Sequence, residues 1–536
     1  MLGLKNLTMR YPTGLLFENI NIELNKGERY GLIGANGAGK STLLKIMAGE
    51  LEASSGEVQI ATGARLGVLG QDQFAFEEYS LEHAVLYGNK RLFDAVMEKE
   101  KIYAETIDYS DEINDRLSQL ELLCAEEDPN YDWQSRCERI LSNLNLKDPQ
   151  ALMSSLQNAD KFKVLIAQVL FAKPDILLLD EPTNNLDLPA IAWLESELAR
   201  HEGLIIVISH DRYFLNSVCT RMLDIDFKTL REFAGNYDDW YTQSTLLARQ
   251  KEAKLAKNLK EKEELENFIR RFSANVAKAR QASSRQKQLE KLDLEEIKTS
   301  SRRDPSILFR PNREIGNELL AIKNLSKSYG EKVVYRDLTL ATKRDDKIAL
   351  IGPSGAGKST LLSMIAGLLK PDSGSAELGV TVELGYFEQD VASSITSDLR
   401  LYDYLMSEKH KDIDEIRKCL GRMLFSGADQ EKAAKDLSGG EKHRLTLSKL
   451  MLERGNFLLF DEPDNHLDLE AIIALGEALY NFKGALICAT HDRDLIRAFA
   501  NRIWSLEPVE ASGASPRFEL IDFLGSYEEF LASRAA

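Results

Sequence analysis

Two stretches of the sequence decide the fold of this chain: GANGAGKS at residues 34–41 and GPSGAGKS at residues 352–359. Both fit the pattern G-x-x-x-x-G-K-[ST], and each follows a short apolar run and precedes a helix-like run. Glycines let the backbone wrap closely around phosphates, and amides at a helix N-terminus point at the anion. A glycine-rich turn without a ligand is the alternative for one match, but two matches with partner motifs favour phosphate binding.

The two loops belong to an internal repeat with an offset of 318 residues. Further downstream the acid-to-histidine gap is 30 residues in both copies. From Gln71 to Leu156 there are 85 residues, but from Gln389 to Leu437 only 48, so the first copy carries about 37 extra residues at about 78–150. The repeat predicts two similar domains, the first with an arm-like insertion.

Short apolar runs such as DILLLD and NFLLFD fit strands buried on both faces, and amphipathic stretches lie between them. We therefore expect an α/β class with a mainly parallel sheet in each copy, and antiparallel strands near 55–70 and 375–390 added to it. The predicted domains are residues 1–240, a basic linker at 241–316, and residues 317–536. The linker sequence predicts a helical hairpin that bends near residues 273–284.

The phosphate loops predict which residues hold ATP and Mg²⁺. Lys40 and Lys358 neutralise phosphates, and the serine and acid side chains suit the metal. The predicted ATP-binding residues of the loops are Gly34, Asn36, Gly37, Gly39, Lys40, Ser41 and Thr42 in the first copy, and Gly352, Ser354, Gly355, Gly357, Lys358, Ser359 and Thr360 in the second. The predicted metal ligands are Ser41, Gln71 and Asp180 in one site, and Ser359, Gln389 and Asp461 in the other.

Three further pairs of side chains carry predicted roles. Glu181 and Glu462 each follow the metal-binding acid and are predicted to polarise the attacking water as general base; a capping pair at a strand end is the alternative. His210 and His491 are predicted to orient the γ-phosphate, although a lone histidine is more often structural. Tyr11 and Tyr329 lie 29 residues before the lysines and could stack on adenine, with a core tyrosine as the alternative.

Composition limits the class of protein. The chain has 536 residues, a formal net charge of −17 and a mean hydropathy of −0.29. This balance argues against a protein that coats nucleic acid over its whole surface. No run approaches the ~18–20 apolar residues that a membrane-spanning helix needs, and the N-terminus lacks the regions of a signal peptide. Because the five cysteines are scattered, we expect reduced thiols in a cytoplasmic protein.

A family resemblance rests on motifs that the phosphate loops do not explain. LSGGEKHR (437–444) resembles the signature sequence of ATP-binding cassette proteins. Two cassettes in one chain, the charged linker, and the segments GNYDDWY (235–241) and GSYEEF (525–530) resemble the ABC-F family. QDQFAFEE (71–78) and FSANVAKARQASSR (272–285) are similar to its bacterial YbiT-type branch.

The resemblance implies a monomer whose two cassettes form a head-to-tail dimer within the chain. Site one would then pair Lys40, Glu181 and His210 with the second signature, at Ser438, Gly439, Gly440 and Glu441. Site two would use the signature of cassette one, which reads LQNAD (156–160), so Gln157, Asn158 and Ala159 replace the serine and glycines. We therefore expect that site one hydrolyses ATP and that site two binds it with slow turnover. Asp464 stands where threonine is commoner, with no role evident from the sequence.

The linker carries the predicted contact with RNA. Residues 241–303 contain sixteen Lys and Arg against nine Asp and Glu, a net charge of +7, whereas the rest of the chain has −24. Basic side chains neutralise backbone phosphates, and a solvated helical linker is the alternative. The predicted RNA-binding residues are Arg270, Arg271, Lys278, Arg280, Arg285 and Lys287. The arm at 78–150 resembles the family's arm that contacts the ribosomal stalk region, although a protein-facing role is as plausible.

The resemblance implies a Mg²⁺-dependent ATPase that binds the tRNA exit site of the ribosome in its ATP-closed state. Its linker would reach towards tRNA and the ribosomal RNA of the large subunit, and hydrolysis would release it. No membrane subunit is expected. The alternatives are the ATPase part of a membrane transporter, a DNA-associated ATPase, and a binding-only switch with negligible turnover.

Overall fold

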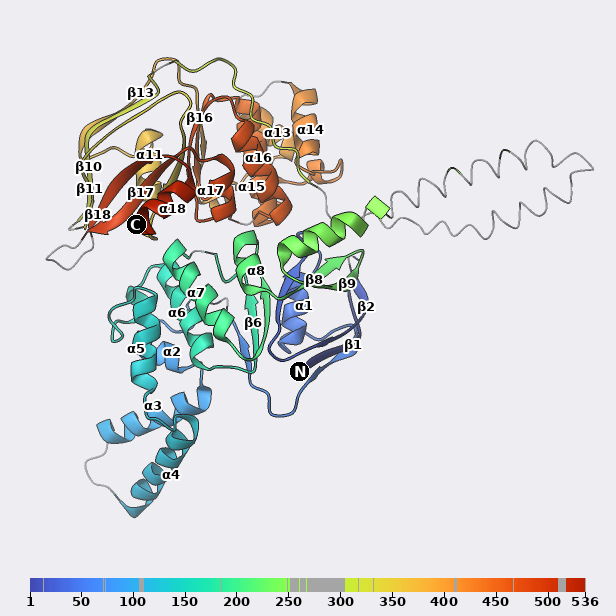
Figure 1. Cartoon of the computed structure of the whole chain (residues 1–536), viewed down its shortest axis with the longest axis vertical. Helices are drawn as coiled ribbons and strands as arrows, with labels where there is room; N and C mark the ends of the chain where they lie inside the picture. The colour runs from blue at the N-terminus through green and yellow to red at the C-terminus, as the bar shows by residue number, and fades with distance from the viewer. Residues whose placement is uncertain are drawn as a thin grey trace, which may run out of the picture.

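The computed structural model describes residues 1–12, 14–70, 72, 74–105, 110–184, 186–247, 249–250, 260, 267, 304–316, 318–330, 332–408, 412–465, 467–509 and 517–535 (Figure 1). Both phosphate loops are among them. The predicted metal ligand Gln71 lies outside the described residues, and so do the predicted hairpin and all six predicted RNA-binding residues of the linker: Arg270, Arg271, Lys278, Arg280, Arg285 and Lys287.

The first cassette alternates strands with helices, as the apolar runs predict. Its strands are β1 (Leu2–Tyr11), β2 (Gly14–Leu24), β3 (Arg29–Ile33), β4 (Ser55–Ile60), β5 (Leu66–Val68), β6 (Ile176–Asp180), β7 (Leu204–Ile208), β8 (Arg221–Asp226) and β9 (Thr229–Ala234). Its helices are α1 (Lys40–Met47), α2 (Leu81–Leu86), α3 (Lys90–Glu105), α4 (Asp111–Glu127), α5 (Trp133–Asn143), η1 (Met153–Ser155), α6 (Asn158–Phe171), α7 (Leu188–Arg200) and α8 (Arg212–Val218). Residues 237–247 are also helical.

The second cassette repeats this order. Its strands are β10 (Leu320–Tyr329), β11 (Lys332–Thr342), β12 (Lys347–Ile351), β13 (Ser373–Leu378), β14 (Leu384–Phe387), β15 (Phe457–Asp461), β16 (Ala485–Ala489), β17 (Arg502–Val509) and β18 (Arg517–Leu524). Its helices are α11 (Lys358–Ile365), α12 (Val391–Ser394), α13 (Leu401–Ser407), α14 (Ile413–Arg422), η2 (Asp429–Glu431), η3 (Ala434–Asp436), α15 (Gly439–Glu453), α16 (Leu469–Asn481), α17 (Arg493–Phe499) and α18 (Tyr527–Ala535).

Each cassette contains two sheets. The larger sheets have the strand orders β5-β6-β7-β3-β8-β9 and β14-β15-β16-β12-β17-β18, in which only the last pair is antiparallel. The smaller sheets, β2-β1-β4 and β11-β10-β13, are antiparallel. The prediction that antiparallel strands near 55–70 and 375–390 join the main sheet was therefore wrong. β4 and β13 belong to the separate sheets, while β5 and β14 extend the main sheets in parallel.

The parallel strands bring the sequence motifs to one edge of each main sheet. In cassette one the adjacent strands β6, β7 and β3 end at Asp180, just before His210, and at the phosphate loop. Their apolar side chains are buried on both faces, as the unbroken apolar runs predict. Ligands in open α/β sheets bind outside the carboxyl ends of the strands, so this edge is the expected place for a nucleotide.

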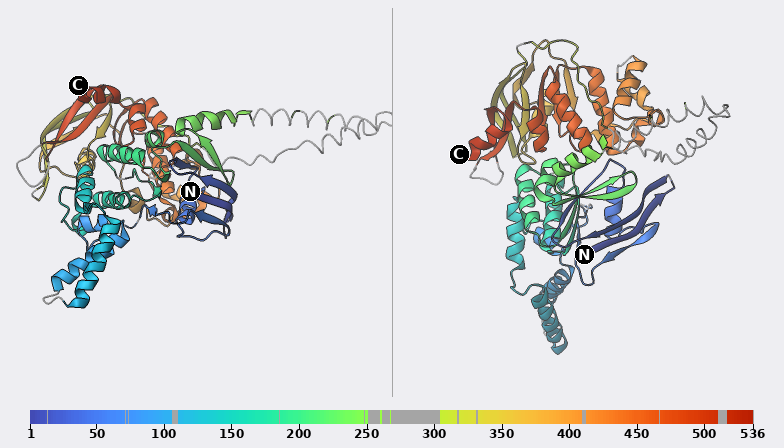
Figure 2. Two further views of the ribbon diagram at one scale, coloured as in Figure 1. Left: turned by 60° about the horizontal axis from the view of Figure 1, so that its bottom comes forward. Right: turned by 45° about the vertical axis from the view of Figure 1, so that its right-hand side comes forward.

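The insertion at 78–150 forms α2 to α5, and the hairpin of α3 and α4 projects away from the cassettes (Figures 1 and 2). It is tied together by ion pairs such as Arg116 to Glu98 at 2.7 Å. Among the described residues, no helix is both long and apolar enough to span a membrane. All five cysteines are free and buried.

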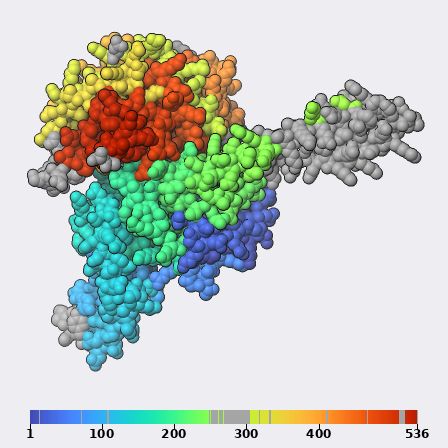
Figure 3. Space-filling model, viewed as in Figure 1, coloured from blue at the N-terminus to red at the C-terminus, as the bar shows by residue number. Residues whose placement is uncertain are grey.

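The two cassettes lie against each other (Figure 3). Arg493 on α17 reaches across to Glu195 on α7, with Nη1 at 3.3 and 3.5 Å from the two carboxylate oxygens. The guanidinium of Arg493 also lies 4.6 Å above the ring of Tyr213 on α8, and that of Arg497 lies 5.0 Å above it. We call this interface between the cassettes the seam.

Candidate nucleotide-binding sites

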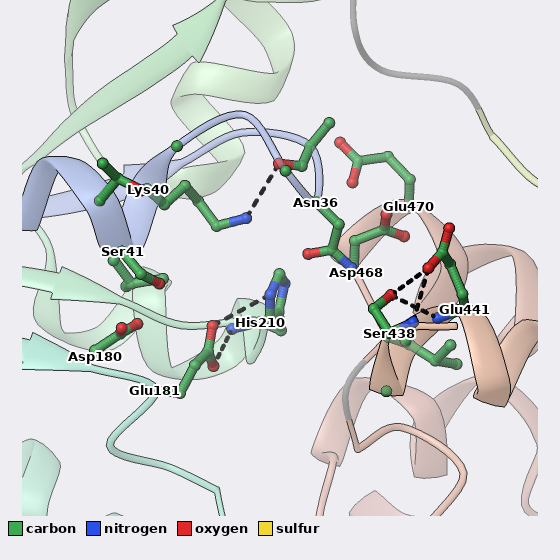
Figure 4. Close-up of a pocket in the computed structure, with 18 of the residues that line it drawn as sticks. Asn36, Lys40, Ser41, Asp180, Glu181, His210, Ser438, Glu441, Asp468 and Glu470 are labelled. Carbon is green, nitrogen blue, oxygen red and sulfur yellow. Dashed lines mark hydrogen bonds and ion pairs between the residues drawn. The ribbon is translucent and has the colours of Figure 1, made fainter. Parts of the chain in front are cut away.

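A cavity of about 900 Å³ lies between the two cassettes (Figure 4). One wall comes from cassette one and the other from the signature region of cassette two. Of the predicted site residues, it is lined by Tyr11, Asn36, Gly37, Gly39, Lys40, Ser41, Thr42, Asp180, Glu181, His210, Ser438, Gly439, Gly440 and Glu441. The structure thus brings together residues some 400 positions apart that the sequence assigned to site one.

The phosphate loop of site one has the geometry that an anion requires. Gly39 has φ 103°, and a Cβ there would lie 2.7 Å from Leu16 Cδ2, so only glycine fits. The next residue, Lys40, begins α1, so the first amides of this helix point toward the place of a phosphate. Its Nζ donates to the carbonyl oxygens of Gly34 at 2.7 Å and Ala35 at 3.4 Å, which holds the ammonium group inside the loop.

Glu181 is held by His210 on both of its carboxylate oxygens. Oε2 accepts the His210 backbone N–H at 3.3 Å, and Oε1 lies 3.2 Å from His210 Nε2. Burial raises the pKa of Glu181 to about 7, against the opposing effect of Lys40. Its backbone lies in the left-handed region, with φ 50°, a strained conformation that occurs most often at functional sites. A carboxylate with a pKa near neutrality suits a general base.

The opposite wall begins with the signature of cassette two. Ser438 is the N-cap of α15, and Ser438 and Glu441 form a capping box in which Glu441 Oε2 accepts from the serine N–H at 2.8 Å. The serine fixes the start of the helix. Gly439 and Gly440 have no side chains that would keep a phosphate away from their backbone amides.

The sequence did not predict several other residues that line the cavity. They are Leu16, Ala35, Asn184 and Ile208 from cassette one, and Leu424, Arg444, Asp464, Leu467, Asp468 and Glu470 from cassette two. Arg444 is the last residue of the signature LSGGEKHR, which the sequence analysis recognised. That Arg444 lines the cavity depends on how the two cassettes meet. Asp464 was visible as a departure from a pattern, and the remaining residues were not singled out by any motif used in the sequence analysis.

Site two gathers the corresponding residues of cassette two into a tighter network. Lys358 Nζ donates to the oxygens of Gly352 at 2.9 Å and Pro353 at 3.2 Å, and lies 3.0 Å from His491 Nε2. Burial and the neighbouring Lys358 lower the pKa of His491 well below its usual value, so the imidazole is neutral. Its Nε2 accepts a hydrogen bond from the ammonium group of Lys358. Tyr329 is half exposed, 5.6 Å from Lys327 Nζ, outside this network.

Glu462 in site two has partners that differ from those of Glu181. Its Oε2 accepts from Gln389 Nε2 at 2.8 Å and from Asn465 Nδ2 at 3.0 Å, while His491 Nε2 is 3.9 Å from Oε1. Among the residues that the structure describes, two amide donors satisfy this carboxylate, whereas Glu181 is held by the imidazole and backbone of a histidine; Gln71, the counterpart of Gln389, lies outside them. The described surroundings of the two acids therefore differ although their sequence motifs are alike.

The residues of site two fit a divalent cation. Asp461 Oδ1 is buried and finds no hydrogen-bond partner among the described residues, and burial raises the pKa of Asp461 to about 7. Ser359 Oγ lies 3.3 Å from Gln389 Oε1, so hydroxyl, amide and carboxylate oxygens converge. Such oxygens are the ligands that Mg²⁺ prefers, and a cation would restore the charged carboxylate.

The signature of cassette one still begins a helix but lacks its cap. Gln157 is the N-cap of α6, and its side chain makes no capping hydrogen bond in the described structure. Gln157 and Asn158 are exposed and Ala159 is half buried. The helix start that the family resemblance pairs with site two therefore carries side chains where the other signature has two glycines.

Asp464, for which the sequence indicated no role, replaces a hydroxyl in a repeated hydrogen bond. In cassette one the Oγ1 of Thr183 lies 3.0 Å from Ser209 Oγ; in cassette two Asp464 Oδ1 accepts from Thr490 Oγ1 at 2.6 Å. Asp464 is half-buried at the seam, and its partial loss of water raises its pKa to about 6, with the charges of Glu462 and Asp211 adding to the effect. A negative charge at this place opposes closure of the seam.

Comparison with known proteins identifies the two halves. The family profile described as ABC transporter matches residues 17–184 and again 335–465, and a second profile of the same description matches residues 223–309, which span the linker region. These matches confirm the predicted fold class of two cassettes with a linker between them.

Relatives match over nearly the whole chain. The Uncharacterized ABC transporter ATP-binding protein YkpA of Bacillus subtilis (strain 168) is 44% identical over 99% of this chain and 97% of its own length. The Probable ATP-binding protein YbiT of Escherichia coli O157:H7 is 42% identical over 100% and 99%. ABC transporter F family member 2 of Arabidopsis thaliana is 34% identical over 98% and 78%.

A similar fold occurs in a solved structure described as the complex of the archaeal ribosomal stalk protein aP1 and the archaeal ribosome recycling factor aABCE1. The TM-score is 0.59 at 18% identity, and the match covers 98% of this chain and 92% of that one. At this identity the likeness shows the shared arrangement of two cassettes.

The raised pKa of Glu181 predicts how turnover depends on pH. A general base must be ionised, so turnover should fall as the pH falls through about 7, the pKa of Glu181. The measurement is the turnover number against pH with saturating ATP and Mg²⁺. The Glu462→Gln variant should keep the same profile, because the other site supplies the turnover. A profile that stays flat through neutral pH would exclude Glu181 as the base.

The half-buried charge of Asp464 predicts a pH-dependent closure of the seam. Its pKa is raised on closure, so protonation favours the closed form at low pH, and this contribution is lost as the pH rises through about 6. Asp464→Thr, which copies Thr183, should close at a lower ATP concentration than the wild type at neutral pH, because the charge that opposes closure is removed.

Fluorescence energy transfer between labelled cassettes measures this closure during an ATP titration. Asp464→Asn is the matched control that removes the charge and keeps the shape, and it should behave like Asp464→Thr. Identical closure of the wild type and both variants at every pH would contradict the role of the charge.

Proposed function

This chain belongs to the ABC-F family of tandem ATP-binding cassette proteins, and we propose that it is an ATPase that binds ribosomes when ATP closes its two cassettes. The cavity at site one carries the proposal, because its two walls come from different cassettes. A nucleotide that fills it joins the cassettes, and its loss lets them part. ATP must then bind the closed form better than ADP does.

Hydrolysis at site one requires a base, a phosphate grip and a metal. Glu181 takes a proton from the attacking water, and His210 keeps its carboxylate in place. Lys40 and the amides of α1 neutralise the phosphates. Ser41 and Asp180 would hold Mg²⁺, as Ser359, Gln389 and Asp461 would in site two. The ion supplies charge neutralisation on the phosphates.

We further propose that site two turns over slowly. Its signature has lost the serine cap, and Gln157 and Asn158 place side chains where the other signature has serine and glycine. Glu462 accepts hydrogen bonds from two amides, and the ammonium group of Lys358 donates a hydrogen bond to His491. These contacts support storage of ATP at site two and cleavage at site one.

The proposed partner is the ribosome. The acidic body and the positive linker favour an approach to RNA with the linker first. The fold shared with the archaeal ribosome recycling factor agrees with a cytoplasmic protein that acts in translation. In this proposal the linker reaches the tRNA and ribosomal RNA from the tRNA exit site, and hydrolysis releases the factor.

A transporter ATPase that works with separate membrane subunits is the second candidate, because the matched family is described as ABC transporter. The transporter hypothesis assigns no function to the basic linker. Sedimentation with membranes in place of ribosomes would favour it.

Separate substitution of the two acids tests the asymmetry. Glu181→Gln should lower ATP turnover about 100-fold or more, as loss of a general base typically does. Glu462→Gln should lower it by less than about threefold, because site two contributes little. The measurement is steady-state phosphate release by the purified protein. Equal loss from both substitutions would contradict the asymmetry, and no loss from either would contradict the assignment of the acids.

Sedimentation tests the partner. The double variant Glu181→Gln, Glu462→Gln should remain closed with ATP and should sediment with ribosomes through sucrose, whereas with ADP it should stay at the top of the gradient. In a matched comparison, exchange of the six basic linker residues for glutamine in the double variant should lower the ribosome-bound fraction. The same six substitutions in the wild type should leave ATP turnover without ribosomes unchanged. The proposal fails if the double variant ignores ribosomes or binds them equally with ATP and ADP.

A further inference from the structure

Arg444 is a cation that cassette two presents to the cavity of site one. It lies on α15, five residues after the helix begins at Gly439, so it stands about 7.5 Å farther along the helix axis. Its guanidinium carbon is 5.6 Å from the centre of the Phe425 ring. The neighbouring Leu424 lines the same cavity. Arg444 therefore belongs to the part of the wall around Leu424 and Phe425.

The side chain has an unsatisfied polar atom at this place. Arg444 Nε is buried and has no hydrogen-bond partner within the described part of the chain. A buried donor without a partner costs free energy, and the cost disappears when a ligand accepts its proton. The Nε–H points along the plane of the guanidinium, so the acceptor that satisfies it must lie at the edge of this group, as an oxygen or nitrogen atom of a nucleoside can.

The rest of the cavity locates the nucleoside. Lys40 and the start of α15 mark the place of the phosphates. The apolar part of the cassette-one wall is formed by Tyr11 and Leu16, and Leu424 supplies an apolar side chain from cassette two. A purine needs such surroundings, since its faces are apolar and its edges polar.

We propose that Arg444 binds the nucleoside of the ATP at site one from the opposite cassette, with its Nε–H donating to an acceptor atom of the nucleoside whose base packs on Tyr11 and Leu16 of the other wall. This inference rests on the proposed ATPase and adds a residue that no phosphate contact requires. Closure then senses the base as well as the phosphates, and a bare polyphosphate closes the cassettes less well than ATP.

The equivalent residue of site two cannot do the same. Lys163 stands seven residues after Leu156, as Arg444 stands seven after Leu437. Its Nζ is buried and ion-paired with Asp160 Oδ1 at 3.1 Å and with Asp187 Oδ2 at 3.5 Å. This ammonium group is held by two carboxylates and so is not available to a nucleoside. The two sites thus differ in their hold on the nucleoside as well as in their signatures.

Steady-state kinetics in the Glu462→Gln background tests the role of Arg444, because site one then supplies the turnover. Arg444→Ala should raise the KM for ATP about tenfold, within the range for loss of a hydrogen bond from a charged donor. The kcat should change by less than about threefold, because the interaction is made in both ground and transition states. Arg444→Lys keeps the charge without the Nε–H and should recover less than half of the lost affinity on a logarithmic scale.

Arg417 provides the matched control. It is exposed, its guanidinium lies 5.5 Å above the ring of Tyr402, and it is not part of the cavity wall. Arg417→Ala should leave both kinetic constants unchanged. Tripolyphosphate, which has no nucleoside, should inhibit the wild type and Arg444→Ala with the same inhibition constant. Thermal melting without nucleotide should be unchanged in Arg444→Ala.

Three results would overturn the inference: an unchanged KM in Arg444→Ala, full recovery by Arg444→Lys, or tripolyphosphate inhibition that weakens together with ATP binding. The last two would show that Arg444 acts as a simple charge on the phosphates. Failure of the ATPase proposal itself looks different, because turnover would then persist in Glu181→Gln.

Discussion

The phosphates of ATP carry several negative charges, and one phosphate loop covers only part of them. The remaining wall of site one comes from a helix that begins some 400 residues later in the chain, so the site is complete only when the two cassettes touch. Every other feature of the seam acts on that contact. Arg493 holds Glu195 and Tyr213 across it, which favours closure. A nucleotide that fits both walls also favours the closed arrangement of the cassettes.

Carboxylates at the seam oppose closure of the two cassettes. Burial raises the pKa of Asp211 to about 6 and that of Asp492 well above its usual value, and Asp464 lies between them. Each carboxylate loses water when the seam closes, and like charges meet there. An interface built only of attractive contacts would stay shut after hydrolysis. In the proposed cycle, repulsion at the seam would give the open form a share of the population, as binding and release require.

Local motifs could be predicted from the sequence because their chemistry depends on neighbours along the chain. The phosphate loops, the acids after β6 and β15, and the buried parallel strands were all visible as short patterns. The smaller antiparallel sheets were misassigned, because alternating strands such as β4 carry no signal for which sheet they join. The different partners of Glu181 and Glu462 were hidden for a similar reason: identical motifs sit in different surroundings.

The family resemblance implied that the second signature faces site one, but the individual side-chain contacts across the seam could not be predicted, since they depend on how two domains meet. Arg444 looked like the last letter of a signature, and only the structure places it in the cavity wall. The substitution at Asp464 was visible as a departure from a pattern, yet its hydrogen bond to Thr490 and its neighbour Asp211 come from tertiary and interdomain packing.

A distance measurement between the cassettes tests most directly whether ATP joins them. Spin labels on cysteines introduced at the exposed positions Glu57 and Val380 report one distance from each cassette, and the five native cysteines are buried. With a non-hydrolysable ATP analogue and Mg²⁺, the account predicts one short, narrow distance distribution, which becomes longer and broader without nucleotide. The same distribution in both conditions would contradict a clamp closed by nucleotide.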